Sequence, residues 1–170
     1  MTAASLRRAG PAASEHRATA RAKDTLSLGP LADVVGYHLA QASVVAMVDF
    51  ERHIGTPFGL RKVEFSLLML LLANGAVPPK QLAQALALAP PALTLLLDRL
   101  QQRHLLRRQQ NPADGRSQHI VLTPAGQRLA QDCAAASVGM EQELAQRLSR
   151  AELAILIELL GKIADRASAS

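Results

Sequence analysis

Apolar residues recur three and four positions apart over most of the chain, a spacing typical of helices that bury one face. The pattern predicts helices over about residues 31–54, 60–73, 80–86, 92–102 and 124–136, and a last one after Ser149. Residues that end helices separate them, since Gly55, Pro57 and Gly59 follow the first and Asn74-Gly75 follows the second. We therefore expect a mainly α fold.

Two of the later helices carry clear starting signals. Thr123 is the expected N-cap of one, with Pro124 at its first position. Ser149 and Glu152, three residues apart before an apolar run, form a capping box.

The first long helix is apolar on two sides. One side carries Leu31, Val34, His38, Ala42, Val45 and Asp49. The other side carries Leu39, Ser43, Met47 and Phe50. A helix with two apolar sides needs two partners. We expect one partner to be the rest of its own domain and the other to be a second copy of the chain, which predicts a homodimer.

After His104 the helical pattern gives way to strand and turn patterns. Residues 105–108 and 118–122 read as two short strands, and the residues between 111 and 116 are rich in turn formers. The two strands predict a β-hairpin with a charged tip.

The composition narrows the class of protein. Of the 170 residues, 49% are hydrophobic and 19% charged, which indicates a globular chain. The net charge of +5 suits a polyanionic partner, either nucleic acid or an anionic membrane surface, although a solvated basic surface is the simpler alternative. The longest apolar stretch, residues 65–73, is too short to span a bilayer, and the N-terminus lacks the apolar core of a secretory signal.

The single cysteine, Cys133, excludes an intrachain disulfide and any metal site built from several cysteines. This usage fits a reducing, cytoplasmic location. No neighbouring basic residue in the sequence would lower the pKa of Cys133, so we interpret it as a packing residue rather than a redox sensor.

The chain is expected to divide into an arm and one domain. Residues 1–27 are rich in Ala, Ser and Arg without apolar periodicity, which predicts an exposed, disordered basic arm. Residues 28–170 form the domain, in which 60–122 make a DNA-binding lobe and 31–56 and 123–165 the dimerisation helices.

Two helices joined by a tight turn and followed by a hairpin have the layout of a winged helix-turn-helix. The second helix of such a pair enters the DNA major groove, which is wide enough for one α-helix. Between Pro78 and Arg116 there are six basic and two acidic side chains, so most of the net charge lies on the proposed DNA face.

Within this stretch the sequence resembles the MarR family of bacterial regulators. The resemblance rests on QLAQALALAPPALTLLLDRL followed by LLRRQQNPADGRSQHIVLTPAG. The family pattern has Asp-Arg-Leu at the end of the recognition helix, Pro-x-Asp-x-Arg in the wing and Leu-Thr-x-x-Gly after it. These correspond to residues 98–100, 112–116 and 122–126, and the flanking helices extend the resemblance to about 31–165.

The resemblance implies roles for individual residues. Arg116 at the wing tip would lie in or beside the minor groove, where narrow segments attract arginine, and Asp114 would orient it. The alternative is an ordinary hairpin turn with a solvated Asp-Arg pair. The full set of expected DNA-contacting residues is Lys80, Gln81, Pro91, Ala92, Thr94, Leu95, Arg99, Arg103, Arg108, Asp114 and Arg116.

Many members of the family release DNA when a small aromatic carboxylate or phenol binds between the dimerising helices and the DNA-binding lobe. We predict that Arg61 binds the carboxylate of such an effector, because arginine forms bidentate pairs with carboxylates and a helix begins there. Tyr37, His38 and Ser43 would assist. The alternatives are that Arg61 pairs with Glu51 or Glu64 and that His38 is a core residue.

The sequence thus predicts a homodimeric repressor that binds double-stranded DNA at a palindromic operator and is released by a small effector. The alternative is a dimerising interaction module whose winged helix binds DNA weakly or not at all. Leu95 and His104, which stand where the family commonly has a polar residue and a glycine, favour that alternative. The sequence lacks a His-Glu-x-x-His motif and a glycine-rich phosphate loop, so we expect neither an enzyme nor a cofactor or metal.

Overall fold

The computed structural model describes residues 26–111 and 114–164, and for residues 111, 114–117 and 143–144 it describes the backbone alone. The basic arm predicted over 1–27 lies outside the described residues except for its last two positions. The chain divides into two units, residues 1–42 and 43–170, which are described separately.

The first unit holds a short 3₁₀-helix, η1 (Gly29–Asp33), and the beginning of α2 (Val35–Phe50). The helix expected from residue 31 is therefore interrupted, because Val34 takes an extended backbone between the two segments. None of the described residues of this unit is buried. Its exposed apolar side chains include Leu31, Val34, Val35 and Leu39.

The prediction that the first long helix breaks at Gly55 and Pro57 was wrong. Helix α2 continues directly into a π-helical segment, η2 (Glu51–Gly55), and then into α3 (Thr56–Phe58). Pro57 lies within this continuous path, directly after Thr56, whose N–H donates to the Glu51 carbonyl in the wider hydrogen-bond spacing of a π-helix. The chain turns at Gly59, the third residue predicted to end this helix, and its φ of 59° is the left-handed conformation that ends many helices.

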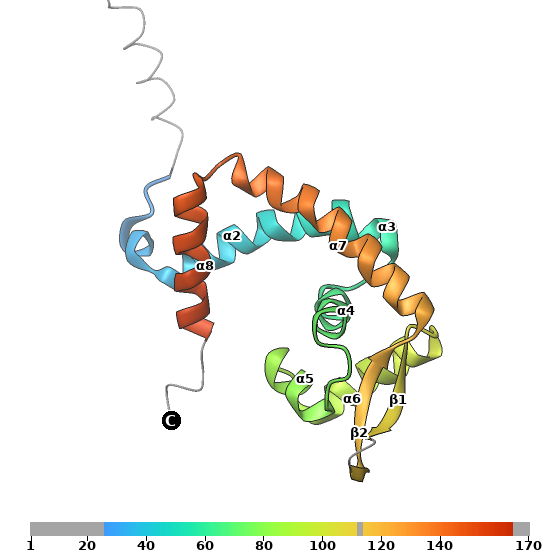
Figure 1. Ribbon diagram of the computed structural model, residues 1–170. Coiled ribbons are helices and arrows are strands. Elements are labelled where there is room, and N and C mark those ends of the chain that lie inside the picture. The colour runs from blue at the N-terminus through green and yellow to red at the C-terminus, as the bar shows by residue number, and fades with distance from the viewer. Residues whose placement is uncertain (1–25, 112–113, 165–170) are drawn as a thin grey trace, which may run out of the picture. The chain divides into compact units, whose positions relative to one another are not determined.

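Helix α4 (Lys62–Asn74) lies at the centre of the second unit (Figure 1). Helix α4 is buried on two sides. Leu67 and Leu71 join the cluster beneath α5, α6 and the hairpin, while Leu68 joins a second cluster with Phe50, Ile54 and Cys133. Helix α4 therefore has two apolar sides.

Helices α5 (Pro79–Ala85) and α6 (Pro90–Gln102) begin and end close to the predicted positions. Ala87, in the turn between them, and His104, after α6, both have positive φ angles, of 52° and 56°. The family commonly has glycine at position 104, and histidine adopts the positive φ of glycine there. Four leucines of α6 are buried: Leu93, Leu96, Leu97 and Leu100.

Strands β1 (Leu106–Asn111) and β2 (Asp114–Leu122) form the antiparallel hairpin. The return strand was expected to start at Gln118, but it starts at Asp114. The register shifts after Gln110, and this irregularity lets the expected turn residues take strand backbone. An isolated bridge between Val77 and Ile120 ties the segment before α5 to β2.

Helix α7 (Pro124–Ala145) follows the hairpin and runs past the expected end at residue 136. Its start is fixed by the Thr123 hydroxyl, which accepts the Gly126 N–H at 3.0 Å and donates to the His104 carbonyl at 2.6 Å. A Cβ on Gly126 would lie 1.8 Å from the Leu105 carbonyl oxygen, so no larger residue fits without rearrangement.

The last helix, α8 (Arg150–Ala164), begins with the predicted capping box. The Ser149 N–H donates to the Glu152 carboxylate at 2.7 Å, and the Glu152 N–H donates to the Ser149 hydroxyl at 3.3 Å. Over the described residues, no helix is both long enough and apolar enough to cross a membrane.

Candidate nucleic-acid interface

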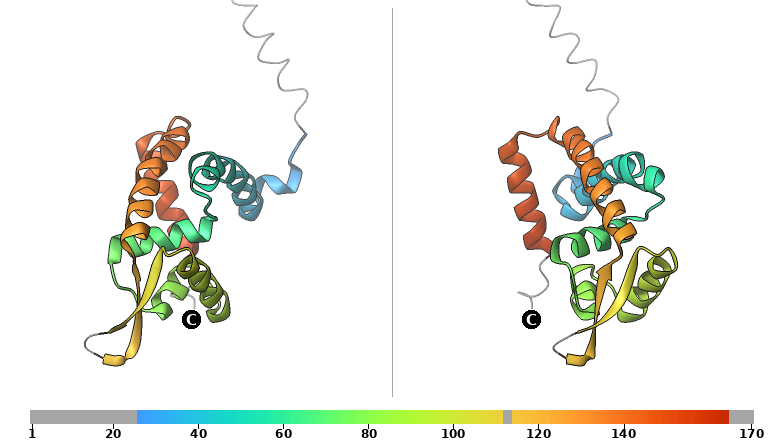
Figure 2. Two further views of the ribbon diagram at one scale, coloured as in Figure 1. Left: turned by 90° about the vertical axis from the view of Figure 1, so that its right-hand side faces the viewer. Right: turned by 45° about the vertical axis from the view of Figure 1, so that its right-hand side comes forward.

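Helix α6 presents an outward face beside the β1–β2 hairpin, and α5 lies next to it (Figure 2). The leucines of α6 turn inward, which leaves Pro91, Ala92, Thr94 and Leu95 exposed. All four are among the residues expected to contact DNA. Their common face follows from the leucine spacing alone, because the buried positions fix the helix rotation.

The chemistry of this face is largely apolar. Leu95 is 72% exposed, and an apolar side chain there can contact only the methyl group of thymine. The Thr94 hydroxyl donates to the Pro90 carbonyl at 3.1 Å, so its lone pairs remain available to accept from a base or a water. Direct reading of bases by α6 therefore depends on few polar atoms.

An open groove of about 1440 Å³ runs between α5, α6 and the hairpin. Its lining includes Lys80, Thr94, Arg108 and Gln118, so the structure brings together three of the predicted DNA-contacting residues. Lys80 and Gln81 are both exposed in the first turn of α5. Exposed polar and basic side chains in this place suit contacts to phosphate oxygens.

Arg108 joins the hairpin to α6. Its Nη2 lies 2.6 Å from Oδ1 of Asp98, and both side chains are partly exposed. The ion pair orients Arg108 along the helix that is proposed to read DNA. An exposed pair of this kind adds little to stability, so its value lies in geometry.

Asp114 and Arg116 lie at the start of β2, and their side chains fall outside the described part of the structure. Their roles at the wing tip therefore stay predictions. Both lie at the turn end of the hairpin, away from α6, which precedes the hairpin, and from α7, which follows it (Figure 1).

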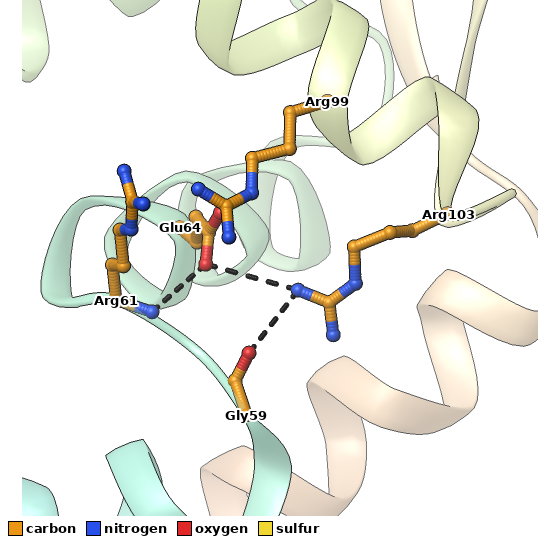
Figure 3. Close-up of polar contacts among 5 residues, drawn as sticks. All are labelled: Gly59, Arg61, Glu64, Arg99 and Arg103. Atoms are coloured by element: carbon orange, nitrogen blue, oxygen red, sulfur yellow. Dashed lines mark hydrogen bonds and ion pairs between the residues drawn. The ribbon is translucent and has the colours of Figure 1, made fainter.

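Arg99 and Arg103 meet a carboxylate that the sequence reasoning did not single out for DNA binding. Glu64, in the first turn of α4, is fully buried. Its Oε1 lies 3.1 Å from Nε of Arg99, and its Oε2 lies 3.7 Å from Nη1 of Arg103 (Figure 3). The Arg99 contact is an ion pair without the alignment of a hydrogen bond. The position of Glu64, three residues after a helix start, was the available signal.

The four predicted effector residues are divided between the two separately described units. Tyr37 and His38 belong to the first unit, where their rings meet edge to face and His38 Nε2 hydrogen-bonds to the Ala32 carbonyl at 2.8 Å. Ser43 and Arg61 belong to the second unit. The proposed shared pocket thus remains a prediction.

Arg61 lines an open cavity of about 580 Å³ next to α4. The lining residues are Met47, Glu51, Gly55, Gly59, Leu60, Arg61, Lys62 and Val63. Only the backbone N–H of Arg61 contacts Glu64, at 2.8 Å, while its guanidinium points away from that carboxylate (Figure 3). In this lining the two cations, Arg61 and Lys62, outnumber the one carboxylate, Glu51, and apolar side chains lie beside them, a composition that suits a small organic anion.

Cys133 is fully buried between α4 and η2. Burial, and then the neighbouring Asp132 carboxylate, raise the pKa of its thiol to about 11. The reactive thiolate is therefore scarce at neutral pH, as suits a packing residue. Within the described residues, no group of His, Cys, Asp and Glu side chains is arranged to hold a metal ion.

Comparison with known proteins agrees with this geometry. A family model described as "MarR family" matches residues 60–118. The multiple antibiotic resistance protein MarR of Salmonella typhimurium is 32% identical over 64% of this chain and 76% of its own length.

Two solved structures share the fold and more than a quarter of the aligned sequence. One is the transcriptional repressor CouR bound to a 23-mer DNA duplex, at 30% identity and a TM-score of 0.75 over 83% of this chain and 99% of that one. The other concerns regulation of DNA binding of Bordetella bronchiseptica BpsR by 6-hydroxynicotinic acid, at 27% identity and a TM-score of 0.70 over 78% of this chain and 94% of that one.

Proposed function

The chain belongs to the MarR family of transcriptional regulators, which are not enzymes, and from this premise we propose that it is a homodimeric repressor of the cytoplasm. In this proposal it binds a palindromic operator and is released by a small aromatic acid or phenol. The observation that carries the proposal is the outward face of α6, held between α5 and the hairpin with its leucines turned inward.

The proposed DNA contacts divide by the part of the duplex that they meet. Thr94 contacts a base or phosphate, and Ala92 and Leu95 contact thymine methyl groups. Pro91 lies against the groove wall. Phosphate contacts come from Lys80, Gln81, Arg99, Arg103 and Arg108. Arg116, oriented by Asp114, enters the minor groove. Because base contacts are few, operator choice depends strongly on the wing and on DNA shape.

The proposed dimer is formed by residues 31–56 and 123–165, with 60–122 as the DNA-binding lobe of each subunit. Support comes from apolar side chains that the single chain leaves in water. On α8 alone, Ile155, Ile157 and Ile163 are each more than half exposed. Large exposed apolar patches mark interaction surfaces.

The proposed effector is a small organic acid held by Arg61, with Tyr37, His38 and Ser43 assisting. Support comes from the cavity that Arg61 and Lys62 line and from the small aromatic acid that regulates the relative BpsR. An anion bound there would neutralise charge close to the start of α4, where helical N–H groups also favour it.

Binding to DNA is tested on the wing. Arg116→Ala should weaken operator binding by about 1–3 kcal/mol and leave the dimer intact, because a minor-groove arginine is lost without any change to the core. The measurement is a gel shift at several salt concentrations with the region next to its own gene. Unchanged affinity would remove the wing from the proposal.

Response to an effector is tested on Arg61. Arg61→Ala should abolish the release of DNA by aromatic acids and leave operator affinity near that of the wild type, since the guanidinium points away from the contacts between α4 and α6. A thermal-shift screen of aromatic acids identifies the probe. A variant that the same acid still releases would refute the assignment.

A second candidate is an interaction module with a degenerate winged helix. The exposed Leu95 at the centre of the α6 face favours it, since an apolar residue there suits a protein partner as well as a thymine methyl group. The gel shift decides, because genuine DNA binding weakens steeply with salt, whereas failure to bind any duplex at low salt would favour the module.

A further inference from the structure

Glu64 is a buried charge at a junction of helices. It is fully buried in the first turn of α4, and its Oε2 accepts the backbone N–H of Arg61 at 2.8 Å. A buried carboxylate is costly unless cations and hydrogen bonds surround it. The helix N-terminus offsets part of that cost, because its N–H groups carry partial positive charge.

The two cations come from the end of α6. Arg99 lies in its last turn and Arg103 is its C-cap, so they stand four residues apart on one side of the helix. Both contact Glu64, and Arg103 Nη1 also donates to the Gly59 carbonyl at 3.2 Å (Figure 3). We call these four residues, Gly59, Glu64, Arg99 and Arg103, the Glu64 clamp.

The clamp and the leucine face of α6 constrain the helix differently. Leu93, Leu96, Leu97 and Leu100 pack in the core and set which face of α6 is buried, but apolar packing is non-directional and constrains small rotations less than ion pairs do. Ion pairs and hydrogen bonds at one end fix rotation and translation along the axis. Because Thr94 and Leu95 lie on the exposed face of the same helix, a small rotation of α6 would misplace them against DNA.

We infer that Glu64 is a positioning residue for DNA recognition, which holds the recognition helix α6 in register through Arg99 and Arg103. The inference rests on the proposed DNA-binding function and deepens it. It also gives these two arginines a role besides the phosphate contacts expected of them, since both already face an anion within the protein.

The inference has a distinctive signature in binding. Loss of the carboxylate removes one negative charge and frees two cations, so binding to arbitrary DNA should hold or tighten. Binding to the correct sequence should weaken, because it needs α6 in register. A residue with a merely structural role would lower both affinities together as the folded fraction falls.

The experiment compares Glu64→Gln with Glu141→Gln, an exposed α7 position that undergoes the same charge change. Fluorescence anisotropy measures binding to the tightest duplex selected from a random pool and to a scrambled duplex. For Glu64→Gln the ratio of the two affinities should fall at least about tenfold, while Glu141→Gln should keep it within about twofold. A Glu64→Gln ratio equal to that of the wild type overturns the inference.

Arg103→Gln gives a second test that does not depend on tolerance of a substitution at the buried site, since Arg103 is partly exposed. If Arg103 positions α6 through Glu64 besides contacting a phosphate, the affinity ratio falls while the slope against salt drops by about 0.9. If it is only a phosphate ligand, both duplexes weaken equally and the affinity ratio stays at the wild-type value, which overturns the inference. Wild-type protein that binds no duplex at low salt overturns the proposed function as well.

Discussion

Helices α6 and α8 have similar lengths but opposite surroundings. Helix α6 buries four leucines within its own chain, whereas α8 has no buried residue. The outer face of α6 is therefore held in place by the chain's own core and is available to a ligand; it consists of Pro91, Ala92, Thr94 and Leu95. The apolar side chains of α8 are left unburied by the described chain, as expected of a helix that packs against a second copy.

The polar contacts of the two helices differ in the same way. Arg99 and Arg103 of α6 reach a buried carboxylate, so their positions are strongly specified. On α8, the ion pair between Glu158 and Lys162 is about two-thirds exposed at each partner, and such pairs contribute little. Orientation is thus built into α6, while association of α8 relies on apolar area.

The largest effect is expected in the core beneath α6. Leu100→Ala should lower the free energy of unfolding by about 2–5 kcal/mol, because Leu100 is fully buried and its removal leaves a cavity. Leu95→Ala on the same helix is the matched control and should stay within about 0.5 kcal/mol, since Leu95 is exposed. Urea denaturation measures both. Equal effects would show that α6 is rotated from the orientation described.

A smaller effect is expected on α8, and on assembly rather than folding. Ile157→Gln should raise the dimer dissociation constant at least about tenfold, because a side chain that is 61% exposed in the single chain would be buried against the partner. Glu158→Gln, the neighbouring position with the same new residue, should change it by no more than about twofold. Analytical ultracentrifugation makes the comparison. A dimer that tolerates both substitutions equally would place the interface elsewhere.

The features that the sequence predicted are those fixed by neighbours along the chain. The starts of α7 and α8 follow from Thr123 and from the Ser149–Glu152 pair, and each cap is made by residues within three positions. His104, where the family commonly has glycine, has the positive φ that glycine favours. The division of α6 into buried leucines and an outer face follows from helical periodicity.

The features that were missed depend on contacts far apart in sequence or on backbone adjustment. Glu64 meets Arg103 across 39 positions, so only the packing of α4 against α6 reveals the clamp. The early start of β2 reflects pairing with β1, which overrides the turn preference of the residues before Gln118. The continuous path through Pro57 required a π-helical segment that leaves no periodic signature.

The smallest effect is expected at the start of α8, where Glu152 is fully exposed. Hydrogen bonds from Ser149, first from its side chain and then from its backbone, lower the pKa of the Glu152 carboxyl below its usual 4.5. Because the pKa of Glu152 is lower in the folded state, the carboxylate stabilises the helix at pH values above the ordinary pKa. This contribution is lost as the pH falls through the lowered pKa. In an NMR titration Ser149→Ala should return the pKa toward 4.5, and acid should fray the first turn of α8 in the wild type more than in Glu152→Gln. An unchanged Glu152 titration in Ser149→Ala would mean that the capping box is open in solution, leaving α8 to be held at that end by its partner alone.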